Sequence, residues 1–229
     1  MLLRGPVHRQ VTSRSINPST FLIEPERMAF MEVNSQLNGR IEDFGSAFWQ
    51  LMEKRSPSFQ LRTKAKSALL EIEYSDRYLN SPLPVRLLRE VLAKAPGVDA
   101  ATVVKLTTAD MMSNTYGSSP NLFKHDWRVT THRNSVLAGV FSKDFSQKFS
   151  LVTKDKRDVA HGRALRLVYA DGVTVLHLDQ GFGYWTTTTP VYFAFSAAVP
   201  DQIVDLRRAT FQVRSTAHFA TWIVINDER

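Results

Sequence analysis

Cysteine is absent from all 229 residues. The chain therefore has no disulfide bond, no thiolate zinc site and no cysteine nucleophile, and nothing in it points to an oxidising compartment. It also lacks a run of about 18 apolar residues, and residues 1–15 lack the continuous apolar centre of a secretory signal. These absences predict a soluble protein of the reducing cytoplasm with no transmembrane segment.

Several motifs of nucleotide and hydrolase chemistry are missing as well. No GxxxxGK[S/T] sequence is present, so the chain by itself is not a nucleotide-driven motor. Gly181-Phe182-Gly183 follows a predicted hairpin without opening a helix and is not a dinucleotide fingerprint. The GxSxG esterase elbow is absent, and the six histidines form no HxxxH or HExxH pair. We therefore predict no metal site and no cofactor.

The charge and size of the chain indicate a folded, basic protein. Lys and Arg number 29 against 22 acidic residues, and this surplus favours polyanionic partners, although such a balance is also common in proteins that bind no nucleic acid. A hydrophobic content of 43% supports a sizeable core. We predict an N-terminal arm and helical extension over residues 1–66, serving as a linker to a partner or upstream motor, and an α/β domain over 67–229.

Hydrophobic periodicity predicts alternating strands and helices. The predicted strands cover residues 30–34, 68–74, 101–108, 149–153, 191–195 and 221–225. The predicted helices cover residues 41–52, 82–95, 125–144 and 200–209. Between the first helix and the next strand, Ser56-Pro57-Ser58 is interpreted as a break, followed by a basic cluster of Arg62, Lys64 and Lys66. This order predicts an α/β fold with a mixed sheet flanked by helices.

A hairpin over residues 161–178 is the most informative segment. Asp171-Gly172 lies between two alternating apolar runs, and Asp-Gly readily supplies the positive φ angles of a type I′ turn. Alternate side chains of a strand share a face, so His161 and Arg163 are expected side by side, where they could jointly hold a phosphate. Polar groups also follow the strand 68–74, and strand exits are where ligand groups gather in α/β folds.

These residues carry a family resemblance. The matching pieces are the strand exit 74–79, the His161-x-Arg163 strand with Asp171-Gly172, and the loop 178–182. With them, the segment from about residue 67 to the end resembles the phospholipase D-like domain at the C-terminus of MIT-domain proteins and of some large bacterial defence-associated helicases. Residues 37–49 look like what precedes such domains in the helicase-linked members. The resemblance implies a phospholipase D-like α/β fold and an accessory role beside a helicase.

The chain departs from the active phospholipase D motif, HxKxxxxD. Arg163 replaces the lysine, Val168 stands where the acid belongs, and a second copy of the motif is missing. In that superfamily one histidine attacks phosphorus and a partner histidine protonates the leaving group, so a single incomplete motif must borrow a subunit or lose catalysis. His177 lies across the hairpin and is not an equivalent second histidine. Loss of catalysis with retained anion binding is the simpler interpretation, because Arg presents charged, bidentate donors to phosphate.

Three functions remain open from the sequence. The first is a catalytically inactive module that binds DNA or RNA in a bacterial defence setting, beside a helicase. Its predicted phosphate-binding residues are Arg77, Lys154, Lys156, Arg157, His161 and Arg163. The second is a homodimeric phosphodiesterase or nuclease with His161 as nucleophile, and the third is a scaffold for a protein partner or an anionic membrane surface. Trp127, Tyr184 and Trp185 are candidates for stacking on bases, although burial in the core is the default for such residues.

Overall fold

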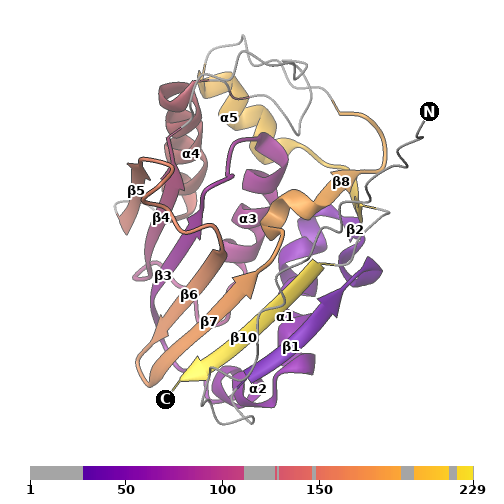
Figure 1. Ribbon diagram of the computed structural model, residues 1–229, viewed down its shortest axis with the longest axis vertical. Helices are drawn as coiled ribbons and strands as arrows, with labels where there is room; N and C mark the ends of the chain where they lie inside the picture. Colours follow the sequence, from indigo (N-terminus) through magenta and orange to yellow (C-terminus); the bar gives the residue numbers. More distant parts are fainter. Residues whose placement is uncertain are drawn as a thin grey trace, which may run out of the picture.

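The computed structural model describes residues 28–110, 127, 129–145, 148–191, 199–216 and 221–228. Its main element is a mixed seven-stranded sheet, and in the view of Figure 1 the helices lie behind the strands. In sheet order the strands are β1 (Met28–Val33), β10 (Thr221–Glu228), β7 (Gly172–Leu178), β6 (Arg163–Tyr169), β3 (Leu69–Asp76), β4 (Val103–Ala109) and β5 (Phe149–Lys154). The expected α/β class with a mixed sheet is confirmed.

The sheet changes character at β3. This strand pairs in parallel with β4, which pairs in parallel with β5. On its other side β3 pairs antiparallel with β6, and the antiparallel arrangement continues through β7 and β10 to β1. A small second sheet contains β2 (Gly39–Arg40), β9 (Gln212–Ser215) and β8 (Trp185–Thr187).

Five α-helices and three short 3-10 helices occupy the described residues. The α-helices are α1 (Phe44–Arg55), α2 (Pro57–Lys64), α3 (Pro82–Ala93), α4 (Thr130–Phe145) and α5 (Val199–Arg208). The 3-10 helices are η3 (Ser35–Leu37), η4 (Ile41–Asp43) and η6 (Gly181–Tyr184). The predicted strand at 191–195 falls almost wholly outside the described residues, as does the start of the helix predicted from residue 125.

The predicted break at Ser56-Pro57-Ser58 is present, because α1 ends at Arg55 and Ser56 has an extended backbone. A second helix that the sequence analysis did not predict, α2, begins directly after it at Pro57. The Ser56 hydroxyl accepts a hydrogen bond from the Phe59 backbone N–H at 3.4 Å, and Pro57 takes the first helical position. This is a capping arrangement in which a serine satisfies a free N–H and proline loses nothing by lacking one. Phe59, fully buried, anchors α2 to the core.

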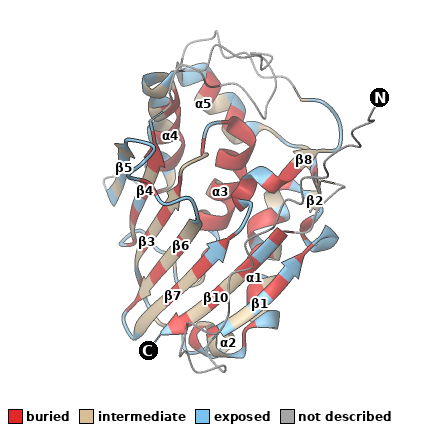
Figure 2. Cartoon of the chain, in the orientation of Figure 1, coloured by how far each residue is buried: buried red, intermediate tan, exposed pale blue. Residues whose placement is uncertain are grey.

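The core lies between the helices and one face of the sheet. Along the strands buried residues alternate with half-buried or exposed ones, as Figure 2 shows for β6, β7 and β10. Residues before and after position 66 share this core, and the Trp49 indole donates a hydrogen bond of 2.8 Å to the Val91 carbonyl. The domain boundary at residue 66 stays a prediction. On the opposite face of the sheet, Phe30 and Trp222 stack at 4.6 Å, and Phe30 is 64% exposed.

The β6–β7 hairpin forms as expected, but its turn lies one residue earlier. Tyr169 pairs with Gly172, so Ala170 and Asp171 make the turn, and the φ angle of Asp171 is negative. The expected type I′ turn centred on Asp171-Gly172 is therefore wrong. The Asp171 carboxylate instead accepts hydrogen bonds from the Arg62 guanidinium at 2.6 Å and the Ser67 hydroxyl at 2.5 Å. The Ser67 hydroxyl and the Arg62 charge hold the pKa of Asp171 below its usual value, despite an opposing contribution from desolvation.

Arg62 is a buried structural residue, whereas Lys64 and Lys66 of the predicted basic cluster are exposed. Its side chain is fully buried and pairs with Asp227 at 2.8 Å as well as with Asp171. It also donates to the Glu228 carbonyl at 3.0 Å, and its guanidinium lies 5.1 Å from the centre of the Tyr169 ring. Arg62 thus joins α2 to the hairpin turn and to the last strand of the sheet.

We expect Arg62→Met to lower the free energy of unfolding by about 3 to 5 kcal/mol, because the change leaves the buried Asp227 carboxylate without its cation. Urea denaturation followed by circular dichroism measures this. Lys64→Met, in the same helix but exposed, is the matched control and should change stability by no more than about 0.5 kcal/mol. Equal stability of the two variants would contradict a structural role for Arg62.

Candidate nucleic-acid interface

The ends of the parallel strands meet at one edge of the sheet. Asp76 at the end of β3 is level with Thr108 in β4, and Ala109 at the end of β4 is level with Lys154 at the end of β5. Because β6 runs antiparallel to β3, it begins at this same edge with Arg163. The edge therefore collects the residues that follow three strands and those that precede a fourth, as strand exits do in α/β folds.

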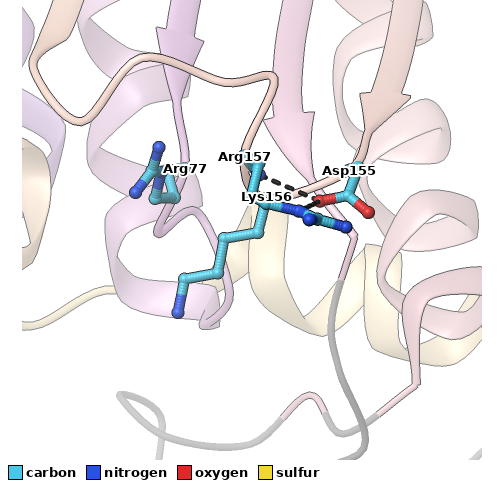
Figure 3. Close-up of a pocket in the computed structure, with 4 residues that line it drawn as sticks. All are labelled: Arg77, Asp155, Lys156 and Arg157. Atoms are coloured by element: carbon cyan, nitrogen blue, oxygen red, sulfur yellow. Dashed lines mark hydrogen bonds and ion pairs between the residues drawn. The ribbon is translucent and has the colours of Figure 1, made fainter.

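A hollow of about 540 Å³ opens at this edge between two strand exits. It is lined by Arg77, Asp155, Lys156 and Arg157, which Figure 3 shows as sticks. In Figure 3 the Lys156 side chain extends away from Arg157, whose backbone N–H donates to Asp155 at 3.0 Å. The N–H and the charge of Arg157 lower the pKa of Asp155. Three cations against one carboxylate leave the hollow with a net positive charge.

Arg77 connects the exit of β3 to the loop after β5. Its Nε donates to the Val159 carbonyl at 3.1 Å, and its Nη2 donates to the same oxygen. Val159 is buried, so this contact fixes the loop that carries Lys156 and Arg157. Arg77 lines the hollow and at the same time supports its wall.

Arg163 is held by the protein itself. Its Nε lies 3.3 Å from the Asp76 carboxylate, its Nη1 donates to the Asp179 carbonyl, and its guanidinium lies 5.0 Å from the centre of the Tyr78 ring. The Arg163 side chain is only 14% exposed. His161 lies in the bend before β6 and not in the strand, so the expected alternation along one strand does not describe this pair.

Asp76 is a buried carboxylate with three hydrogen-bonding neighbours. Besides Arg163, it accepts from the Tyr78 backbone N–H at 2.7 Å and from the Tyr74 hydroxyl at 2.9 Å. Burial raises the pKa of Asp76, although the Tyr78 N–H, Arg163 and Tyr74 favour the charged form. Sequence reasoning did not assign Asp76 a role, although it lies in the strand exit that drew attention.

Tyr78 brings the remaining groups together. Its hydroxyl lies 2.9 Å from His161 Nε2, and the two rings meet edge to face at 5.5 Å. Lys156 Nζ lies 5.8 Å from the centre of the same ring. Three predicted residues, Lys156, His161 and Arg163, thus contact one tyrosine that the sequence did not single out. The sequence contained one signal for Tyr78, because this aromatic residue directly follows Arg77, which was already predicted to bind phosphate.

A family comparison shows what this domain is related to. Residues 27–227 match the family model described as "DEAD/DEAH box helicase YjiV, C-terminal domain". The chain belongs to this family. A comparison with curated proteins found no match. The YjiV C-terminal domain match bears out a helicase-associated domain and suggests an accessory role, and it covers the elements on both sides of the expected boundary at residue 66.

The other predicted residues of this YjiV-type domain divide into exposed and buried ones. The Lys154 side chain is exposed at the end of β5, and its carbonyl accepts from the Asp110 N–H at 2.7 Å. Trp127, Tyr184 and Trp185 are 5%, 4% and 1% exposed, so stacking on bases is not their role and core packing is.

The described part of the chain contains no group of three or more potential metal ligands. His132 bonds Gln202 at 2.6 Å, while His8, His125 and His218 lie outside the described residues. Within the described ranges, no helix is both long and apolar enough to span a bilayer.

We expect Gly181→Ala to destabilise the domain by at least about 1 kcal/mol, because Gly181 has a φ of +56°, which L-residues adopt at a cost. An added Cβ would also overlap Arg163 Cδ and lie 3.3 Å from an Asp76 oxygen. Thermal denaturation measures the effect. Gly183→Ala, in the same η6 but with open space at the Cβ position, is the control. If the two variants have the same melting temperature, the close approach of Gly181 to Arg163 and Asp76 does not require a glycine at this position.

Proposed function

We propose that this domain binds nucleic acid through its phosphate backbone, at the edge where β3, β4 and β5 end. The observation that carries the proposal is the cationic hollow, where Arg77, Lys156 and Arg157 converge from two separate strand exits. Exposed Lys154 extends the positive surface beside it. Cations placed along one edge recognise the repeated charge of a polyanion and not the identity of its bases.

The aromatic residues of this edge also favour a site that contacts the phosphates and not the bases. Among the described residues of this edge, Tyr78 is the partly exposed aromatic side chain, and Lys156 and Arg163 both contact its ring. A ring engaged by cations is a poor platform for an unstacked base. The proposed ligand is therefore DNA or RNA bound without sequence preference.

The wider setting belongs to the same proposal. Membership of a helicase C-terminal domain family supports an accessory role, in which the domain holds nucleic acid next to a helicase motor. We further propose a degenerate phospholipase D-like origin, in a cytoplasmic bacterial defence system, from the resemblance around His161 and Arg163. Arg163 is engaged by Asp76 and the Asp179 carbonyl, which favours a structural use of that motif over turnover.

The test is fluorescence anisotropy of labelled single-stranded DNA, duplex DNA and RNA with the full chain at several salt concentrations. We expect Lys156→Ala combined with Arg157→Ala to weaken binding of all three probes. The slope of log affinity against log salt should fall by about 1.8 with duplex DNA and by about 1.4 with single-stranded DNA, or about 0.9 and about 0.7 for each phosphate that is no longer neutralised. Duplex and single strand should lose affinity alike.

Lys64→Ala combined with Lys94→Ala is the matched control, since both lysines are exposed and removal costs the same charge. Lys64 lies in α2 beside the hairpin turn, and Lys94 follows α3, so both are at the other end of the strands. Absence of affinity at low salt would exclude the proposed function. An equal loss in the control pair would show that only net charge matters.

A further inference from the structure

A buried carboxylate lies next to the proposed polyanion surface, at the end of β3 directly before Arg77. The Asp76 carboxylate is 3% exposed and sits directly behind Arg163 and the strand exit that carries Arg77 and Tyr78. A carboxylate near a polyanion site should weaken binding by simple charge repulsion. Its position requires another explanation, and the hydrogen bonds around it supply one.

We propose that Asp76 and Tyr78 are positioning residues for the polyanion surface, and that the negative charge of Asp76 strengthens binding by organising the surrounding cations. This inference rests on the proposed function. It assigns to these two residues the arrangement of Lys156, His161 and Arg163, which lie between the end of β5 and the start of β6.

The first step is the orientation of the strand exit. The two Asp76 oxygens are used differently: Oδ1 accepts from the Tyr78 N–H and lies 3.3 Å from Arg163 Nε, while Oδ2 accepts from the Tyr74 hydroxyl. The bond to Tyr78 fixes the backbone of the residue after Arg77. Asp76 thereby sets the direction in which both following side chains leave β3.

The second step passes through Arg163. Asp76 and the Asp179 carbonyl hold its guanidinium from two sides, and Gly181 allows the backbone to approach it closely. Held in this way, Arg163 lies against the ring of Tyr78. A cation against an aromatic face is favourable and more so when it is partly desolvated.

The third step places the exposed cations. The Tyr78 hydroxyl fixes the His161 ring at 2.9 Å, and the aromatic ring attracts Lys156, which also lines the hollow. Lys156 is a flexible side chain that loses rotamer entropy when it binds a phosphate. A ring that already restrains it reduces this loss, as preorganisation does in other binding sites.

The experiment measures affinity and salt slope for the same labelled probes with Asp76→Ala and Asp76→Asn. Charge repulsion predicts tighter binding for both variants. Positioning predicts that Asp76→Ala binds about tenfold more weakly, the lower end of what losing a positioning partner costs at metal sites. Asp76→Asn should recover part of the loss, because its oxygen can still accept from Tyr78 and its amide can donate to the Tyr74 hydroxyl.

Tyr78 supplies an independent pair of variants at a partly exposed position. Tyr78→Phe keeps the ring that Lys156 and Arg163 contact and loses the bond to His161, whereas Tyr78→Leu loses both. We expect affinity to fall in the order wild type, Phe, Leu, with a salt slope lower by about 1 in the leucine variant. These variants keep the inference testable if Asp76→Ala does not fold.

Tyr169→Phe controls for loss of stability, since it removes a 3.2 Å bond to the Pro96 carbonyl at the far end of β6. We expect Tyr169→Phe to have a lower melting temperature than the wild type and the same affinity for the probes. Tighter or unchanged binding by the Asp76 variants, or equal affinity of Tyr78→Phe and Tyr78→Leu, would overturn the inference while wild-type binding stands. Absence of wild-type binding would instead remove the proposed function itself.

Discussion

β3 pairs in parallel with one neighbouring strand and antiparallel with the other, and the arrangement of the whole domain depends on this. Parallel pairing with β4 brings successive strand exits to one edge, and antiparallel pairing with β6 brings the start of the hairpin to that edge too. Neither arrangement alone would place Arg77 and Lys156 beside Arg163. The same strand ends in the carboxylate that holds Arg163, so topology and local chemistry meet at Asp76.

Local patterns predicted most of the fold because they depend on neighbours in the sequence. Alternating apolar residues identified the strands, and helical spacing identified α1 and α3. The turn at Asp171 was misplaced because its conformation is set by Arg62 and Ser67, both distant in sequence. Arg62 was grouped with Lys64 and Lys66 in a basic cluster for the same reason: its carboxylate partner, Asp227, lies in the last strand of the sheet.

The candidate site was predictable as a set of residues but not as an arrangement. Strand exits and basic loops pointed to Arg77 and Lys156, which the structure brings to one hollow. The sequence could not show that Arg163 forms an ion pair with Asp76, because tertiary packing decides whether a carboxylate is buried beside it. Tyr78 was overlooked because its partners lie about 80 residues later, in the stretch 156–163, and no spacing rule connects them to it.

The order of strands has a consequence for how the domain is made. Within the described residues, β1 pairs with the large sheet only through β10, which is the last strand of that sheet along the chain. During synthesis β1 must therefore wait for nearly the whole domain to leave the ribosome, and such long-range pairing is slow to form. Until then Met31 and Val33, which are buried in the folded domain, remain open to other chains. Chaperone dependence should accordingly be concentrated at β1.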